Sequence, residues 1–589
     1  MSQGVGADSG GTTSGSPLVL GPMLRYVDET SASIWVETRD AGTVVVRAGG
    51  DSWSARTFGA HGHHYALVEA SGLEPGTRRE YSVEFEGSRV WPPRDGEYPA
   101  PSIATLDPDR RLRMAFGSCR TSVPHDQRGH RTHGVDAMRS YALALASGNE
   151  ADWPDLALFL GDQVYADVTS EEMRDFIRSR RDIEEVPGPE LKDYEEYAHL
   201  YRLAWSDAAN RWLLSTLPSA MIFDDHDIRD DWNASQSWRL KMEATSWWHG
   251  RIVAGLGSYW IYQHLGNLSP GERGEDVLWQ MVAGHDGAAE LDLTDALDAL
   301  ADRADRDPAS YRWSYARDFG DVRLIVVDSR SARVLEPAER SLLDEPEMEW
   351  LDGKMRGGFR HLLIGTSLPY LLPAGLHHVE SWNEAVSTAP VFSDADAGGG
   401  RRHRGARRGM WGRTAERVGE RLRQGLDLEH WAAFQRSFHD MASMAMEVAD
   451  GRRGTAPETV TFLSGDVHFS YVSEVERDSG SRLLQAVCSP IRNPLPRFMR
   501  FFSAAMAYGP AAPMGAAVAR SVHVPDPPFT WKGIRGPWFD NNLAVLEDTP
   551  GGLNLRWVTG VVRDGDHEHP RLDTVAELTL GERSTSDAV

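Results

Sequence analysis

Six short apolar segments, each followed by polar residues, are the feature that most limits how the chain beyond residue 111 can fold. They occupy residues 112–117, 156–160, 220–223, 322–327, 362–365 and 459–463. Stretches with helical character separate them, and apolar runs of this length are typical of buried strands in an α/β sheet. In such sheets the loops at the carboxyl ends of the strands form the functional crevice. The sequence therefore predicts an α/β region whose functional groups follow these segments.

Residues 17–108 show a different pattern. Alternating apolar and polar residues around Trp35, and a Leu-Glu-Pro-Gly-Thr turn at residues 73–77, predict short strands joined by turns. This region resembles a fibronectin type III module. We therefore expect an all-β, fibronectin/Ig-like sandwich at the N-terminal side of the α/β region.

Composition suggests four parts of the chain. Residues 1–16 are rich in Gly, Ser and Thr and are expected to form a disordered tail. The sandwich domain follows at 17–108, and the α/β domain with helical insertions at 109–575. Residues 576–589 are expected to form a polar C-terminal tail.

The charge balance excludes some functions. A net charge of −25 and a pI near 5.3 argue against sequence-specific nucleic-acid binding, which needs a basic face. A small anionic substrate is still compatible, because bound metal ions can dominate the local field. The two cysteines cannot form a disulfide framework.

The sequence also bears on location. No basic segment followed by an apolar stretch and no twin arginine is seen at the N-terminus, so a cytoplasmic location is expected unless a leader was removed. Residues 501–519 carry no charge, but they are dominated by Ala and Gly and contain Pro510 and Pro513. Because prolines break helices, no membrane span is predicted there.

Four of the apolar segments lead into residues that can bind metal ions. The motifs are Ser118-Cys119, Gly161-Asp162-Gln-Val-Tyr165, Asp224-Asp225-His226-Asp227 and Gly465-Asp466-Val-His468. Each alone has an ordinary structural interpretation, such as a buried cysteine or a solvated acidic turn. Two cations about 3.5–4 Å apart need a bridging carboxylate, and they can then activate a water and neutralise phosphoryl oxygens. Four such motifs, each after an apolar segment, predict a two-metal site.

The order of the motifs resembles the metallophosphatase superfamily, whose usual blocks are D-x-H, G-D-x-x-D, G-N-H-[DE] and G-H-x-H. This chain has Ser118-Cys119 in the first block and Tyr165 where many members have Asp in the second. The same departures are found in the alkaline phosphatase D (PhoD-like) family, which combines an N-terminal sandwich with S-C, G-D-x-x-Y, D-D-H-[DE] and G-D-x-H. The resemblance covers nearly the whole chain beyond residue 17. It implies a metallophosphatase αββα sandwich for residues 109–575.

The resemblance implies an iron-type site whose ligands are Cys119, Asp162, Tyr165 and His468. Asp162 would bridge to a second metal. A phenol binds well only as phenolate, a form that Fe³⁺ favours far more than Ca²⁺ does, and a thiolate suits iron or zinc. Tyr165 has a second interpretation, in which it packs beneath the site and hydrogen-bonds to a carboxylate.

The second metal would be held by Asp225 and Asp466, and the resemblance implies calcium there. The expected pair is therefore Fe³⁺ plus Ca²⁺, with Mn²⁺ or Zn²⁺ as alternatives. His226 would lie near the substrate as an acid or electrostatic stabiliser. Asn233 and Asp224 match the family pattern less closely.

Two further arginine features are candidates for phosphate contact, because arginine matches phosphate geometry. Arg492, in Ser489-Pro-Ile-Arg492, follows an apolar stretch and is a candidate catalytic residue, although a structural turn is the alternative. Five arginines between Arg401 and Arg408 form either a solvated loop or a contact to an anionic substrate.

Together these residues favour a phosphoric ester hydrolase, a phosphodiesterase or phosphomonoesterase, in which a metal-bound hydroxide attacks phosphorus. A phosphate ester is then the expected partner. The alternative is a non-catalytic or regulatory binding protein with a degenerate metal site. The complete set of ligand types favours the enzyme. The natural substrate, the preference for monoester or diester and the oligomeric state stay open.

Overall fold

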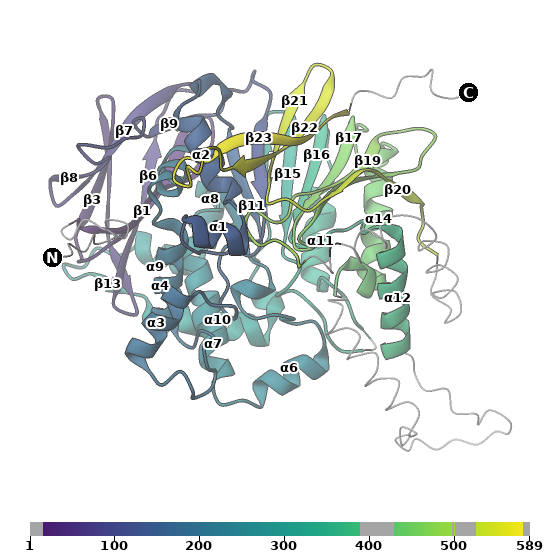
Figure 1. Cartoon of the computed structure of the whole chain (residues 1–589), viewed down its shortest axis with the longest axis horizontal. Helices are drawn as coiled ribbons and strands as arrows, with labels where there is room; N and C mark the ends of the chain where they lie inside the picture. Colours follow the sequence, from purple (N-terminus) through teal and green to yellow (C-terminus); the bar gives the residue numbers. More distant parts are fainter. Residues whose placement is uncertain (1–15, 338, 389–428, 497–499, 501–525, 581–589) are drawn as a thin grey trace.

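The computed structural model describes residues 16–337, 339–388, 429–496, 500 and 526–580. An all-β region at the N-terminus, purple in Figure 1, lies beside an α/β region that contains two further sheets and most of the helices. The predicted fold class, a sandwich followed by an α/β domain with helical insertions, is confirmed.

The sandwich consists of two sheets, ordered β1-β2-β6-β5 and β4-β3-β7-β8, with β9 also paired to β7. Their strands are β1 Leu18–Val27, β2 Ser31–Thr38, β3 Thr43–Ala48, β4 Asp51–Arg56, β5 Phe58–Ala60, β6 His63–Ser71, β7 Arg78–Phe85, β8 Ser88–Trp91 and β9 Ser102–Ala104. Alternate side chains such as Ile34, Val46 and Val68 meet between the sheets. A short strand from the α/β region, β13 (Leu291–Asp292), extends the first sheet by pairing with β5.

The first α/β sheet has the order β12-β11-β10-β21-β22-β23. Its strands are β10 Arg113–Gly117, β11 Leu156–Leu160, β12 Ser219–Ile222, β21 Leu543–Thr549, β22 Gly552–Val561 and β23 Arg571–Leu580. Strands β10, β11 and β12 run parallel, so their carboxyl ends lie at one edge.

The second α/β sheet has the order β14-β15-β16-β17-β19-β18-β20. Its strands are β14 Tyr315–Phe319, β15 Val322–Val327, β16 His361–Thr366, β17 Thr459–Ser464, β18 Ser470–Val475, β19 Arg482–Val487 and β20 Trp531–Trp538. Strands β15, β16, β17 and β19 are parallel. All six apolar segments singled out in the sequence form strands of these two sheets.

The helices fill the connections. They are α1 Gln127–His133, α2 Ala137–Ala146, α3 Glu171–Arg180, α4 Tyr194–Trp205, α5 Ala208–Thr216, α6 Gln236–Glu243, α7 Trp248–Tyr259, α8 Pro270–Glu275, α9 Val277–Ala283, α10 Thr294–Arg306, α11 Glu345–Lys354, α12 Ala374–Thr388 and α14 Gln435–Ala449. Most of the helices from α3 to α10 lie together below the sheets in Figure 1.

The two α/β sheets pack face to face. A Cβ on Gly365 of β16 would lie 3.1 Å from the Leu160 side chain of β11, so the sheets touch at this point. Helix α2 covers the first sheet at β22 and β23, whereas α14 covers the second at β17 and β19. The layers are therefore helix, sheet, sheet, helix, as the family resemblance implied.

The core of the sandwich continues into the α/β region. The rings of Trp35 and Tyr262 lie 5.3 Å apart, centroid to centroid. Arg25 is fully buried, and its guanidinium donates to the carbonyl oxygens of Tyr262 at 2.9 Å and Gln263 at 2.6 Å. The buried Arg25 guanidinium in the sandwich thus finds its acceptors in the α/β region, and apolar side chains of the two regions cover one another.

We propose that residues 17–108 form a structural domain that supplies no metal ligand. A 109–589 fragment should keep every candidate ligand, yet it should aggregate, because removal of the sandwich exposes the apolar surface around Tyr262. Size-exclusion chromatography of the fragment beside the full-length chain checks this. A monodisperse fragment with the melting temperature of the full chain would contradict it.

One domain boundary differs from the sequence prediction. Strand β23 runs Arg571–Leu580 and crosses the predicted start of the polar tail at residue 576. Ala576, Leu578 and Leu580 alternate along this strand and pack against the main core, which explains why the strand continues.

Several sequence predictions fall outside the described residues. These are the tail up to residue 15, the arginines between Arg401 and Arg408, and the uncharged segment 501–519. Among the residues that are described, none of the helices has the length and apolar character needed to cross a membrane.

Candidate metal centre

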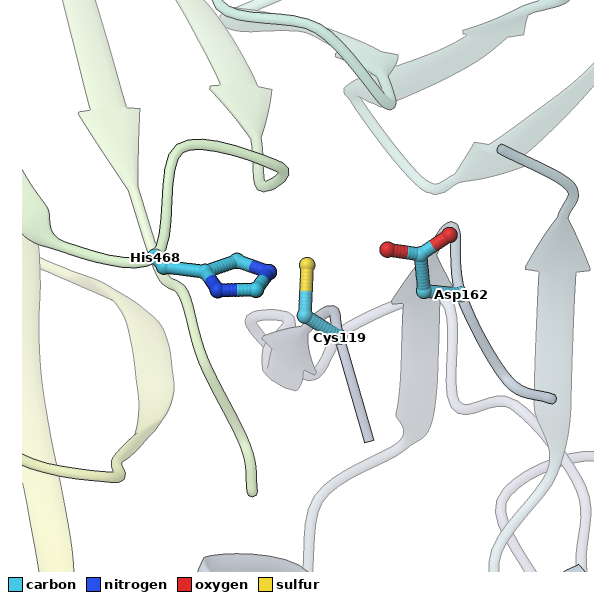
Figure 2. Close-up of side chains that lie close together, drawn as sticks. All are labelled: Cys119, Asp162 and His468. Atoms are coloured by element: carbon cyan, nitrogen blue, oxygen red, sulfur yellow. The ribbon is translucent and has the colours of Figure 1, made fainter. Parts of the chain in front are cut away.

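Loops that follow four strands, three from the first α/β sheet and one from the second, meet at a single place. Three groups of ligand atoms result, and the atoms of each group lie within 4.8 Å of one another: Cys119, Asp162, His468; Asp162, Asp225, His226; and Asp162, Asp224, Asp225, Asp466. Figure 2 shows the Cys119 sulfur between the His468 ring and the Asp162 carboxylate. Asp162 belongs to all three groups, so it lies where a shared ligand would be needed.

The backbone of these loops adopts a conformation that side chains rarely accept. The φ angles are 57° at Cys119, 51° at Asp162, 63° at Asp466 and 55° at His468. Left-handed conformations of this kind cost on the order of 1–3 kcal/mol each and persist only where the surrounding structure holds them. Such residues gather at functional sites, and four of the predicted ligands share this feature.

Two glycines allow the loops to approach each other. A Cβ at Gly465 would lie only 1.8 Å from the Ser118 hydroxyl oxygen. At Gly161, where φ is +98°, a Cβ would lie 2.6 Å from the Asp224 Cβ. A side chain at either position would separate the motifs, which explains why both Asp162 and Asp466 follow a glycine.

The Cys119 thiol is buried at the centre of the first group. Its sulfur accepts a hydrogen bond from the Ser489 hydroxyl at 3.3 Å. Burial, together with the carboxylates of Asp162 and Asp466, raises the pKa of Cys119 well above its ordinary value. The thiolate therefore needs a nearby cation to form, and coordination to a metal ion supplies one.

The Asp162 carboxylate has one occupied and one free oxygen. Its Oδ2 accepts a hydrogen bond from the Tyr165 hydroxyl at 3.1 Å, whereas its buried Oδ1 has no hydrogen-bond partner. Burial and the Asp162 charge raise the pKa of Tyr165 well above its ordinary value. The hydrogen bond is the contact expected from the second interpretation of Tyr165, and it also places the phenol oxygen beside the shared carboxylate.

Further unpartnered oxygens lie in and beside the acidic group, by which we mean Asp162, Asp224, Asp225 and Asp466. Asp224 Oδ2 and Asp231 Oδ1 are buried and lack hydrogen-bond partners. Leaving a buried acceptor unsatisfied costs about 1–3 kcal/mol. Burial, opposed by the positive charge of Arg330, raises the pKa of Asp225 to about 7. Free carboxylate oxygens beside a thiol and an imidazole make a donor set that fits metal ions.

His226 is held by a carboxylate that the sequence prediction missed. Its Nδ1 contacts both oxygens of Asp167, at 2.9 and 3.0 Å, and Asp167 also accepts from the backbone N–H of Asp230 at 2.7 Å. His226 also belongs to the group formed with Asp162 and Asp225, and its Nε2 lies 3.9 Å from Asp230 Oδ1. Only the geometry of the folded chain identifies Asp167, because a carboxylate two residues after Tyr165 has no motif of its own.

Asp466 is oriented by a second missed residue. Its Oδ2 lies 3.0 Å from His430 Nε2, and His430 Nδ1 lies 3.3 Å from Glu380. Carboxylate–imidazole contacts of this kind fix the direction of a ligand. Burial lowers the pKa of His468 to about 4, so its imidazole is neutral and free to bind a cation.

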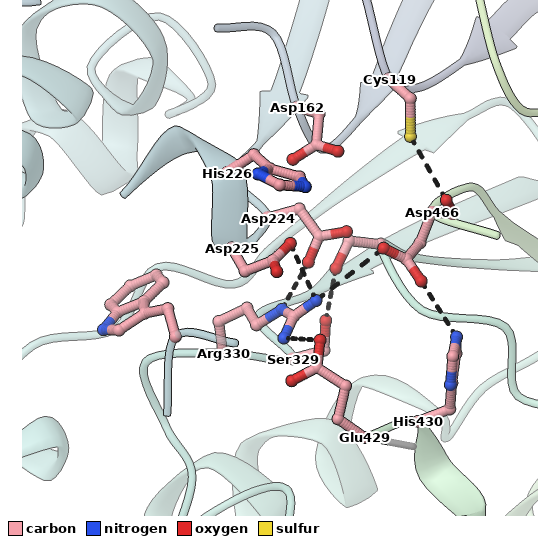
Figure 3. A network of polar contacts seen from close by, with 12 residues as sticks. Cys119, Asp162, Asp224, Asp225, His226, Ser329, Arg330, Glu429, His430 and Asp466 are labelled. Carbon is pink, nitrogen blue, oxygen red and sulfur yellow. Dashed lines mark hydrogen bonds and ion pairs between the residues drawn. The ribbon is translucent and has the colours of Figure 1, made fainter. Parts of the chain in front are cut away.

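Arg330 and Glu429 lie beneath the acidic group, as Figure 3 shows. The Arg330 guanidinium contacts Asp224, Asp225 and Glu429, and the side chain is fully buried. Arg330 follows β15, one of the predicted strands, so the rule that strand ends carry function would have found it. Glu429 follows no such segment.

The contacts of Arg492 lie within the protein, and its predicted contact with a substrate phosphate stays a prediction. Its buried guanidinium donates to the backbone carbonyl oxygens of Val123, Pro124 and Gly134. The donors are used within the protein, where they hold the segments that precede and follow α1. Arg492 therefore matches the alternative interpretation, a structural turn.

Comparisons with known proteins identify the family of this chain. The family model of the PhoD-like phosphatases matches residues 134–497, and that of a domain of unknown function (DUF7800) matches residues 15–103. No curated protein matches the chain.

Two solved structures are similar to the whole chain. One, described as the structure of PhoD, has a TM-score of 0.55 and 14% identity, with 97% of this chain and 92% of that chain covered. The other is a purple acid phosphatase, PPD1, from yellow lupin (Lupinus luteus) seeds, with a TM-score of 0.46, 9% identity and coverage of 95% and 74%. The structure of PhoD supports the fold of this chain. The match to the family model spans more than half of the sequence. The chain belongs to the PhoD-like phosphatase family.

Proposed function

We propose that this chain hydrolyses phosphate esters with two metal ions held by the loops at the strand ends. The observation that carries the proposal is the place of Asp162, whose carboxylate belongs to all three groups of ligand atoms. Two bridged ions would activate a water and neutralise the charge of the phosphoryl oxygens.

The proposed ligand sets follow from donor chemistry. We assign Cys119, Tyr165 and His468 to one ion, because thiolate, phenolate and imidazole suit a transition metal. Asp225 and Asp466 supply oxygen donors to the other ion, as a harder divalent cation prefers. Asp162 is shared between the two.

His226 is proposed as the acid that protonates the leaving-group oxygen. Its Nδ1 contacts Asp167, and the ring belongs to the group with Asp162 and Asp225, so we assign Nε2 as the nitrogen that faces the substrate. Fixing Nδ1 sets the ring orientation, so the proton on Nε2 points into the site. Asp167 acts through His226 and is a positioning residue.

A mixed Fe³⁺ and Ca²⁺ centre is the proposed metal content, with Mn²⁺ or Zn²⁺ as alternatives. Tyr165→Phe should remove or shift a visible charge-transfer band, because the phenol oxygen that would bind ferric iron lies 3.1 Å from Asp162. Absorption spectra of the two purified proteins check this. A colourless, fully active protein containing only zinc or calcium, with Tyr165→Phe equally active, would assign Tyr165 to hydrogen bonding alone.

The proposed function is tested with a phosphomonoester and a phosphodiester that share one chromogenic leaving group. Hydrolysis of at least one is expected, and a chelator should abolish it. The ratio of the two rates decides between monoesterase and diesterase. A protein that binds metal tightly but hydrolyses neither ester would instead be a binding protein.

A further inference from the structure

Arg330 has an unusual position for a permanently charged side chain. It is fully buried, and its Nε donates to Asp224 Oδ1 at 2.5 Å, while its Nη2 lies 3.1 Å from Asp225 Oδ1. The same Nη2 lies 3.9 Å from Asp466 Oδ1. These three carboxylates are members of the four-carboxylate group around Asp162.

The turn that contains Arg330 is held by hydrogen bonds to the Asp328 side chain. Asp328, at the end of β15, accepts from the backbone N–H groups of Arg330 and Ser331, each at 2.8 Å. On the far side, the guanidinium Nη1 contacts Glu429. The guanidinium cannot move away from the acidic group without breaking these contacts, and it is charged at any physiological pH.

We propose that Arg330 is a resident counter-cation of the second metal position, which keeps the carboxylates in place without metal and weakens the binding of the ion there. The inference rests on the proposed metal centre. A guanidinium and a metal ion that share carboxylate oxygens repel each other and compete for the same negative charge. The second ion should therefore exchange more readily than the ion near Cys119.

Figure 3 shows that Arg330 lies at one side of the acidic group. Arg330 approaches Asp224, Asp225 and Asp466 from the side of Glu429, whereas Cys119 and Asp162 lie on the side away from Glu429. The two proposed metal positions therefore differ in their distance from a fixed positive charge. Removing that charge should affect one binding step and spare the other.

Titration of metal-free protein with Mn²⁺ in a calorimeter tests the proposal. Arg330→Met should tighten the weaker binding step by at least about tenfold, because a fixed unit charge a few ångströms away no longer opposes the ion. The tighter step should change little. Metal-free Arg330→Met should melt at a lower temperature than metal-free wild type. Mn²⁺ should raise the melting temperature of the variant by more than it raises that of wild type.

Two further variants separate charge from packing. Arg330→Lys keeps the charge and should bind Mn²⁺ within about threefold of wild type. Arg333→Met removes a neighbouring buried guanidinium, whose ion-pair partner among the described residues is Glu429, and should also stay near wild type. If Arg330→Met does not fold, Arg330→Gln gives the same neutral test.

The outcomes are distinct. Unchanged or weaker Mn²⁺ binding in the neutral Arg330 variants would overturn the proposal. An arginine that only holds the ligands in place would give weaker binding when it is replaced. Equal tightening in Arg333→Met would also overturn it. Wild-type protein that binds no metal would overturn the proposed function itself.

Discussion

Asp162→Asn should lower kcat/KM for phosphate-ester hydrolysis by at least about 10³-fold, because loss of a shared ligand removes several kcal/mol of charge stabilisation. The substitution should leave the local backbone unchanged. Asn has the size of Asp and tolerates the left-handed backbone found at this position, where φ is 51°. The backbone N–H of Asp162 donates to Asp227 at 2.9 Å, a contact that the variant keeps.

Metal content should fall in the same variant. A neutral amide cannot bridge two cations, so both positions lose affinity. The measurement is elemental analysis together with initial rates. Asp548→Asn is the matched control, because Asp548 is also buried but contacts Arg111 and Arg360 at the other end of the sheet. Full activity with normal metal content in Asp162→Asn would disprove the two-metal proposal.

His226→Gln should lower kcat by about 10²- to 10⁴-fold while metal content stays near that of wild type, as expected for loss of a general acid. The loss should be greater for an ester with a poor leaving group than for one with a good leaving group, since only the former needs a proton to depart. Rates on a series of aryl and alkyl phosphates measure this difference.

Asp167→Asn gives the companion result. The amide can still hydrogen-bond to the ring, so a smaller loss with the same leaving-group trend is expected. Equal losses for good and poor leaving groups in His226→Gln would show that the imidazole binds a metal or the phosphate and is not the acid.

Much of the fold could be predicted from the sequence, because apolar runs and the motifs that follow them are local features of the chain. A run such as 156–160 is apolar at every position, which is typical of a strand buried between layers, and β11 has these bounds. The motif after it is contiguous with the strand, so its position at the sheet edge followed directly. Cys119, Asp162, Asp225, Asp466 and His468 do meet in the folded chain for this reason.

What the sequence could not predict depends on long-range packing. Arg330 follows a predicted strand, but its partners Asp224 and Glu429 come from remote parts of the chain, so its contacts could not be predicted from the sequence. The backbone contacts of Arg492 could not be predicted from the sequence for a different reason. Its motif is local, but the carbonyl oxygens that occupy its guanidinium come from the loop around Pro124. Hydrogen-bond partners of buried cations are set by tertiary structure.

Metal content and hydrolysis, measured on one sample as metal is removed and returned, test the metal centre around Asp162 most directly. Protein stripped by a chelator should hydrolyse no phosphate ester, and activity should return as about two equivalents of metal bind. Protein shown by elemental analysis to be free of metal, yet still hydrolysing phosphate esters at the full rate, would contradict the proposed two-metal mechanism.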